Sequence, residues 1–250
     1  MAGSFRRYFV RHMNALRLAR FGELALPPDA GPIVVYSNHP SWWDGIVYLL
    51  AAETLMPGFE PYAPIDARML KRYRVFARMG AFGVDLDKPR GAAAFLTASA
   101  EILSAKDRAL WIAAQGHFSD VRERPLRLKA GLGRLPELAP DCLVVPLAAE
   151  YAFWLERGAE ACLAFGRPMS GRELLALPRE ARMRRLEEAL TALLDRLSAD
   201  VQSREPERFR ILVSGRAGIG GLYDAWRRLA AALRGRRYDP SHGGHERHAA

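Results

Sequence analysis

The chain has 250 residues, of which 50% are apolar and 26% are charged, a composition typical of one globular domain rather than of a disordered chain. The formal charge of +9 favours anionic partners, namely nucleic acid, an anionic membrane surface or a phosphorylated substrate. Two cysteines without metal-ligand or redox spacing argue against a secreted disulfide framework and a zinc site. No uncharged apolar run approaches the ~18 residues that cross a bilayer, so we expect a soluble or peripheral protein.

The N-terminal region is predicted to form an amphipathic helix over residues 5–21, flanked by arginines. Its apolar stripe could lie in a membrane interface or pack on the core of the domain, and the pattern leaves both open. We therefore expect residues 1–26 to form an N-terminal amphipathic segment that could dock on a membrane. The stripe consists of Phe5, Phe9, Met13 and Leu16.

Strand-like and helix-like segments alternate along the rest of the chain, which is typical of an α/β fold with a mixed β-sheet flanked by helices. We expect this domain to span residues 27–234 and a disordered tail to span residues 235–250. The expected strands are residues 33–36, 62–65, 109–113 and 143–149, with a strand-like run at 210–213. The expected helices are residues 41–52, 67–78 and 91–104 and a long surface helix over 180–203, with a turn at 80–84.

A histidine and an aspartate lie five positions apart directly after the first expected strand, as His39 and Asp44. Pro40 cannot sit inside a helix, and Ser41 three residues ahead of Asp44 is typical of a helix N-terminus. His39 in the intervening loop could fold back towards Asp44 and act as a general base, because a carboxylate fixes the imidazole tautomer and stabilises the imidazolium. The spacing alone also fits a structural role, in which Asp44 only caps the helix.

The run Asn38-His39, four residues and Asp44, placed after a short apolar strand, resembles the first motif of the glycerolipid acyltransferase family. That family includes the lysophosphatidate and glycerol-3-phosphate acyltransferases. The resemblance implies an α/β acyltransferase sandwich in which His39, oriented by Asp44, is the catalytic base. It also places Asn38 and Ser41 among the substrate-binding residues.

A later strand leads into Gln115-Gly116-His117-Phe118, and Lys129-Ala130-Gly131 follows. This layout is similar to the family's third block, an aromatic-Pro-Glu-Gly-Thr-Arg segment followed by Lys-x-Gly. The resemblance implies that four of these residues line the substrate site. Three positions depart from the block, since Gln115 stands where Glu is expected, His117 where Thr is expected and Phe118 where Arg is expected. The loss of the Glu and the Arg suggests an acceptor less anionic than lysophosphatidate. The implied lining residues are Gln115, Gly116, Lys129 and Gly131.

Two further segments match the family's remaining blocks. Residues 80–90 are a loose counterpart of the second block, which would make Arg90 a ligand of substrate phosphate, although an exposed residue at a helix start fits the same pattern. Residues 144–147 resemble the fourth block, an apolar strand with a central proline, and Pro146 would shape the substrate pocket. A phosphate contact could instead come from a basic loop that is otherwise only solvated. Its cations are Arg122, Arg124, Arg127 and Lys129.

Together these matches imply an O-acyltransferase that moves a fatty acyl group from acyl-CoA or acyl-carrier protein to a hydroxyl of a lysophospholipid, glycerol phosphate or other lipid alcohol. The implied partners are these substrates and the cytoplasmic face of the cell membrane, with no metal, no resident cofactor and no nucleic acid. One alternative is a catalytically inactive lipid-binding or scaffolding protein that retains the fold. Another is a basic nucleic-acid-binding protein, which is disfavoured because the charge is spread along the chain without a reader motif.

Overall fold

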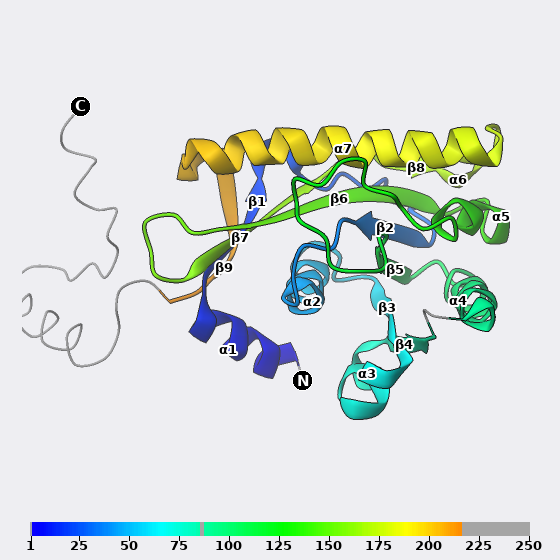
Figure 1. Ribbon diagram of the computed structural model, residues 1–250, viewed down its shortest axis with the longest axis horizontal. Helices are drawn as coiled ribbons and strands as arrows, with labels where there is room; N and C mark the ends of the chain where they lie inside the picture. Colours follow the sequence, from blue (N-terminus) through cyan, green and yellow to red (C-terminus); the bar gives the residue numbers. More distant parts are fainter. Residues whose placement is uncertain (1, 86–87, 217–250) are drawn as a thin grey trace, which may run out of the picture.

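The computed structural model describes residues 2–85 and 88–216, which form a mixed β-sheet with helices on both faces (Figure 1). The expected α/β fold is therefore confirmed. Within the described residues the strand order is β4-β3-β5-β2-β6-β7-β1-β9, and β8 pairs with β6. The strands are β1 Met13–Ala19, β2 Ile33–Ser37, β3 Glu60–Asp66, β4 Ala81–Val84, β5 Arg108–Ala113, β6 Leu143–Ala152, β7 Ala159–Phe165, β8 Met169–Ser170 and β9 Phe209–Ser214.

The central strand β2 runs parallel to both of its neighbours, β5 and β6, and this register positions the loops that follow. Ser37 at the end of β2 lies opposite Ala113 at the end of β5 and opposite Leu147 of β6. Because the carboxyl ends of parallel strands meet at one edge of a sheet, the loops after β2 and β5 emerge side by side. β6 continues beyond this edge to Ala152 and pairs antiparallel with β7.

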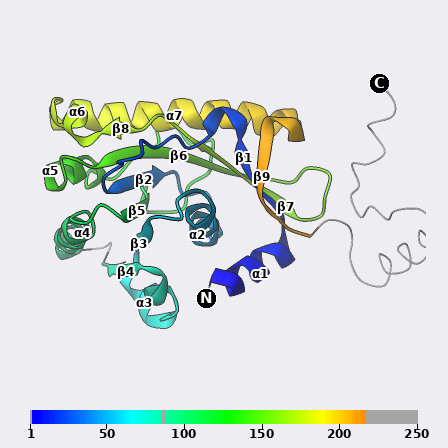
Figure 2. The ribbon, with the colours of Figure 1, turned by 180° about the vertical axis from the view of Figure 1, so that it is seen from behind.

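Helices cover the two faces of the sheet in separate layers (Figures 1 and 2). One face carries the long helix α7, Arg179–Ser203, whose leucines pack against alternate residues of β2 and β6 such as Val34 and Val144. The other face carries α1, Ala2–His12, and α2, Asp44–Leu55, packed against residues such as Val35 and Val145. The remaining helices are α3 Ala67–Arg72, α4 Pro89–Ile102, α5 Leu135–Leu138 and α6 Gly171–Leu175.

The N-terminal helix ends at His12, so the expectation of one helix over residues 5–21 was wrong. Residues 13–19 instead form β1, which lies between β7 and β9 and is buried along nearly its whole length. Pairing on both sides satisfies the backbone of this segment, and this tertiary gain outweighs its helical periodicity. The apolar side chains of Phe9, Met13 and Leu16 belong to the core.

Several other boundaries also differ from the expected ones. The helix expected from residue 41 begins at Asp44, because Ser41, Trp42 and Trp43 form a turn in which the Ser41 carbonyl accepts from the Asp44 N–H. The turn expected at 80–84 is strand β4, paired with β3. The helix expected over 67–78 breaks after Arg72, and α7 is a core-covering helix rather than only a surface element. Residues 217–250, which hold the expected tail, lie outside the described residues.

Leu190, fully buried in α7, tests the role of this helix as the cover of one sheet face. Leu190→Ala is expected to lower the free energy of unfolding by about 2–5 kcal/mol, because the substitution leaves a cavity in a packed core. Urea unfolding followed by circular dichroism measures the change. The matched control is Glu188→Ala on the exposed side of α7, for which we expect a change within about 0.5 kcal/mol. Equal losses in the two variants would contradict the packing described.

Candidate active site

The loop between β2 and α2 is held at the edge of the sheet by Asn38. The Asn38 side-chain amide donates to the Ala149 carbonyl at 2.8 Å, and its oxygen accepts from the Ala149 N–H at 2.9 Å. The Asn38 carbonyl also accepts from the Tyr48 hydroxyl of α2 at 3.0 Å. These bonds tie the loop to β6 and to α2, so the residue that follows Asn38 has a defined position. That residue is His39.

His39 and Asp44 come together as the sequence predicts, with 2.6 Å between Nδ1 of the imidazole and Oδ2 of the carboxylate. Asp44 is 1% exposed and opens α2, where the helix dipole favours a negative charge. Its Oδ2 also accepts from the Ser41 N–H at 3.2 Å. Its Oδ1 accepts from the Tyr151 hydroxyl at 2.6 Å. The buried carboxylate is therefore satisfied by three donors, as a buried anion requires.

This arrangement fixes the chemistry of the imidazole. With the Nδ1–H donating to Asp44, the other ring nitrogen, Nε2, carries the lone pair of the neutral ring. No group in the described part of the chain bonds to Nε2, and the His39 side chain is 24% exposed. The ring can thus take a proton at Nε2 from a hydroxyl that approaches from outside, while the carboxylate stabilises the resulting cation.

Gln115 lies behind His39 rather than in the open part of the site. Its side-chain oxygen accepts from the His39 N–H at 2.9 Å, and its amide nitrogen donates to the Leu126 carbonyl at 3.1 Å. Gln115 is 1% exposed, and both of its polar groups are bonded within the protein. Because the His39 carbonyl also accepts from the Ser119 N–H at 3.0 Å, the backbone of His39 is held from both sides by the loop after β5.

Gly116 and Lys129 lie together beside this loop. Gly116 has φ +70, and a Cβ added there would lie 3.0 Å from Cε of Lys129, so the lysine side chain passes close over the glycine. The Lys129 N–H donates to the Ala114 carbonyl at 2.8 Å, which fixes the lysine backbone against the end of β5. The structure thus places an exposed ammonium near the loop that supports His39. This is the position of a cation that a phosphate could reach.

The structure gives the following positions for the other residues expected at the site. Arg90 is exposed in the first turn of α4. Pro146 is buried in β6 opposite Tyr36, and Gly131 packs close to the ring of Phe95. Their substrate contacts stay predictions. In the basic loop Arg122 pairs with Asp120, Arg124 pairs with Asp195, and the Arg127 N–H donates to Glu187.

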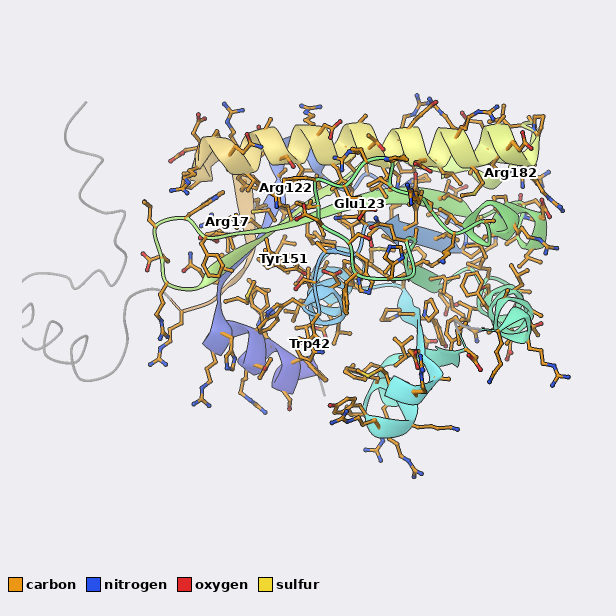
Figure 3. The ribbon with its side chains drawn as sticks, viewed as in Figure 1. Arg17, Trp42, Arg122, Glu123, Tyr151 and Arg182 are labelled. Carbon is orange, nitrogen blue, oxygen red and sulfur yellow. The ribbon has the colours of Figure 1, made fainter. Side chains whose placement is uncertain are left out.

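Two residues at the site were not expected from the sequence. Tyr151 lies between β6 and α2 (Figure 3), in a part of β6 that extends past the strand end we expected at residue 149. Alternation along β6 puts residue 151 on the same face as residue 149, which was the available signal. Phe118 lies against the base, with its ring centroid 4.3 Å from that of His39. Its 59% exposure gives the open side of the site an apolar wall.

The family model described as Acyltransferase matches residues 18–150, a span that holds the His39–Asp44 pair, Gln115 and Pro146. Fold, site and match define the class of protein, and the chain belongs to the acyltransferase family. No curated protein matches the chain. Among the described residues, no helix has the length and apolarity to cross a bilayer. In the same part of the chain, no cluster of three or more His, Cys, Asp or Glu is arranged to hold a metal ion.

Gln115→Glu tests whether this residue supports the catalytic loop through its amide. The new carboxylate would have no N–H to donate to the Leu126 carbonyl. We therefore expect the free energy of unfolding to fall by about 2–4 kcal/mol near neutral pH. Burial raises the pKa of the introduced carboxyl above its unfolded value, so the folded state binds more protons and the loss shrinks as the pH falls towards about 5. Urea midpoints at the two pH values measure both effects.

The matched control is Gln202→Glu, the same chemical change on an exposed turn of α7. We expect this variant to unfold like the wild type at both pH values, because its carboxylate stays in water. A Gln115→Glu variant as stable as the control near neutral pH would show that the amide donor is dispensable.

Proposed function

We propose that the chain transfers a fatty acyl group from an acyl-CoA or acyl-carrier-protein thioester to a hydroxyl of a lysophospholipid, glycerol phosphate or other lipid alcohol. The observation that carries the proposal is the 2.6 Å contact between His39 and the buried carboxylate of Asp44. Membership of the acyltransferase family supports acyl transfer as the type of reaction. The orientation of the imidazole supports its role as the general base.

In the proposed reaction, the acceptor hydroxyl gives its proton to Nε2 of His39 as its oxygen attacks the thioester carbonyl. Asp44 keeps its negative charge and stabilises the imidazolium. The tetrahedral intermediate then collapses, the carbon–sulfur bond breaks, and the thiolate takes the proton from the imidazolium. The products are an ester and a free thiol, and the base returns to its neutral form. The thioester supplies the driving force of the reaction.

The surroundings of His39 favour an amphiphilic acceptor. Phe118 packs against the imidazole, and Trp42, in the same loop as His39, is 54% exposed. These two open aromatic surfaces could contact the apolar part of a lipid. Lys129, whose side chain passes over Gly116, could bind phosphate of the donor or acceptor. This distribution supports a lipid alcohol as acceptor, with the protein acting at the cytoplasmic face of the cell membrane.

A second candidate is a lipid-binding or scaffolding protein that has lost catalysis. The observation that favours it is the combination of Phe118 on the base and Gln115 bonded entirely within the protein. On this reading the aromatic walls hold a lipid while no acyl group is transferred. The two candidates differ in a single property, thioester turnover.

His39→Ala is expected to lower thiol release by roughly 10²–10⁴-fold, because the variant has no base for the acceptor proton. Asp44→Asn should lower it by a similar factor, since an amide can donate to Nδ1 and move the ring proton to Nε2. Thiol release is measured with acyl-CoA and acyl-carrier-protein donors and a panel of glycerol-3-phosphate, lysophospholipid and glycolipid acceptors. Circular dichroism establishes that each variant is folded.

His117→Ala serves as the comparison, because His117 is an exposed histidine of the neighbouring loop whose Nδ1 donates to the Gln115 carbonyl. If His39→Ala kept full activity and His117→Ala lost activity, His117 rather than His39 would be the base, and the proposal would be contradicted. Lipid binding without thiol release from any donor would favour the scaffold.

A further inference from the structure

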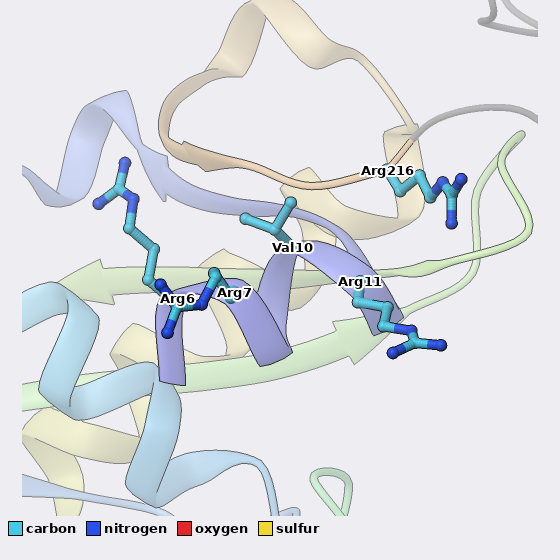
Figure 4. A pocket seen from close by; sticks show the side chains of 5 residues that line it. All are labelled: Arg6, Arg7, Val10, Arg11 and Arg216. Atoms are coloured by element: carbon cyan, nitrogen blue, oxygen red, sulfur yellow. The ribbon is translucent and has the colours of Figure 1, made fainter. Parts of the chain in front are cut away.

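A composite basic surface surrounds α1 on the side of the molecule where the β6–β7 hairpin ends. An open cavity of about 420 Å³ is lined by Arg6, Arg7 and Arg11 of α1 and by Arg216, which follows β9 (Figure 4). A second hollow shares two of these arginines and adds Arg157 of the hairpin. Among the described residues, no carboxylate lines either hollow. Segments far apart in the sequence therefore contribute guanidinium groups to one surface.

The fold holds these cations in place. The Arg216 N–H donates to the Met13 carbonyl at 3.1 Å, which fixes Arg216 beside the end of α1. A Cβ added to Gly158 would lie 2.8 Å from the Asn14 backbone nitrogen, so the hairpin packs directly on the junction between α1 and β1. α1 contains no acidic residue. The positive charge of the surface is thus concentrated rather than compensated, and the surface is complementary to an anionic partner.

An aromatic cluster joins this surface to the catalytic loop. The ring of Tyr8 in α1 stacks on Trp43 with centroids 5.4 Å apart, and Trp42 lies 6.3 Å away in an edge contact. Tyr8 is 43% exposed and Trp42 is 54% exposed. Aromatic rings with one apolar and one polar side, placed next to arginines, suit the boundary between lipid headgroups and acyl chains. Duplex DNA, whose bases are already stacked on one another, or an acidic protein would use the charge but would contact these rings less.

We propose that this composite surface, formed by α1, Arg157, Arg216 and the exposed rings of Tyr8 and Trp42, docks the protein on an anionic phospholipid bilayer. The surface is independent of the reaction chemistry, so it can bind whether or not His39 is a base. Because Trp42 is three residues from His39, docking brings the dyad close to the layer in which a lipid alcohol would be found.

The experiment is sedimentation of the full chain with vesicles of phosphatidylcholine, with and without phosphatidylglycerol. We expect binding to the anionic vesicles only, weakened by salt. The double variant Arg7→Glu with Arg11→Glu should weaken binding to the anionic vesicles about thirtyfold or more, because each arginine near an anionic surface raises the affinity roughly fivefold. Trp42→Ala should weaken it further without changing the salt dependence.

The matched control is Arg184→Glu with Arg185→Glu on the exposed side of α7, which changes the net charge equally. Equal losses in the two double variants would show that only total charge matters and would overturn the docking surface. Absence of binding to anionic vesicles at low salt would also overturn the docking surface. Duplex DNA binding as tight as vesicle binding, lost in the α1 variant, would reassign the surface to nucleic acid.

A different observation, the bond from Tyr151 to Asp44, carries a second inference. Burial raises the pKa of the Tyr151 phenol well above its usual value, so the hydroxyl stays protonated and donates to Oδ1 at 2.6 Å. The titratable groups that face Asp44 are His39 from the loop, Tyr48 from α2 and Tyr151 from β6. Of these, only Tyr151 binds the carboxylate oxygen that the imidazole leaves free.

We infer that Tyr151 is a positioning residue of the dyad, an inference that rests on the proposed function. Its hydroxyl fixes the carboxylate plane and withdraws part of the negative charge from the oxygen that faces His39. Without this donor, the pair holds a proton more tightly. The base is then protonated over a wider range of acidic pH.

Tyr151→Phe is expected to lower kcat about tenfold and to move the acidic limb of the pH–rate profile up by about 0.5–1 pH unit. The control is Tyr36→Phe, which removes a buried hydroxyl that donates to the Leu186 carbonyl, away from Asp44. We expect that variant to lose stability without moving the profile. An unmoved profile in Tyr151→Phe, or the same movement in the control, would overturn the inference.

Titration of the His39 ring followed by NMR gives a readout that does not need turnover. A higher midpoint in Tyr151→Phe than in the wild type would support the positioning role even if the wild type released no thiol, in which case the proposed function alone would fail. Equal midpoints in the two proteins would overturn the positioning role.

Discussion

The site depends on one buried carboxylate. Asp44 is almost inaccessible to water and stands at the N-terminus of α2, where it accepts from an imidazole, a backbone N–H and a phenol. Two donors come from the loop between β2 and α2 and the third from β6, so the anion can be buried only when the loop, the helix and β6 are correctly assembled. The energetic requirement for satisfying the charge therefore also fixes the orientation of His39.

The sheet register supplies the rest of the geometry. β2 lies between β5 and β6, so the loop that carries His39 emerges between the strand that leads to Gln115 and the strand that carries Ala149 and Tyr151. This loop is bonded on both sides, because the His39 N–H donates to the Gln115 side chain and the Asn38 side-chain amide bonds to the Ala149 backbone. His39 is thus carried by a rigid support rather than by a free loop, which is the condition that the proposed general base requires.

The basic surface around α1 and the dyad are structurally connected, although they serve different tasks. Tyr8 of the helix stacks on Trp43 of the loop that carries His39, and Phe9 is buried in the same core layer as the first turns of α2. α1 therefore belongs to the support of the site as well as to the proposed docking surface. Of the two alternatives that the sequence left open for the apolar stripe, the structure shows core packing, because Phe9, Met13 and Leu16 are buried. The proposed docking surface is formed by the arginines and the exposed rings instead.

The sequence by itself determined the α/β class and the positions of the central strands, because these depend on local periodicity. The short spacing between His39 and Asp44 allowed their pairing, and the resemblance of this segment to a family motif favoured it over a capping role for Asp44 alone. The sequence did not determine where the N-terminal helix ends, since residues 13–19 form a strand only when β7 and β9 are present to pair with them. Nor did it reveal Tyr151, Arg157 or Arg216 as neighbours of distant residues. Those contacts join segments up to about two hundred positions apart in the chain, and only the folded sheet brings them within reach of one another.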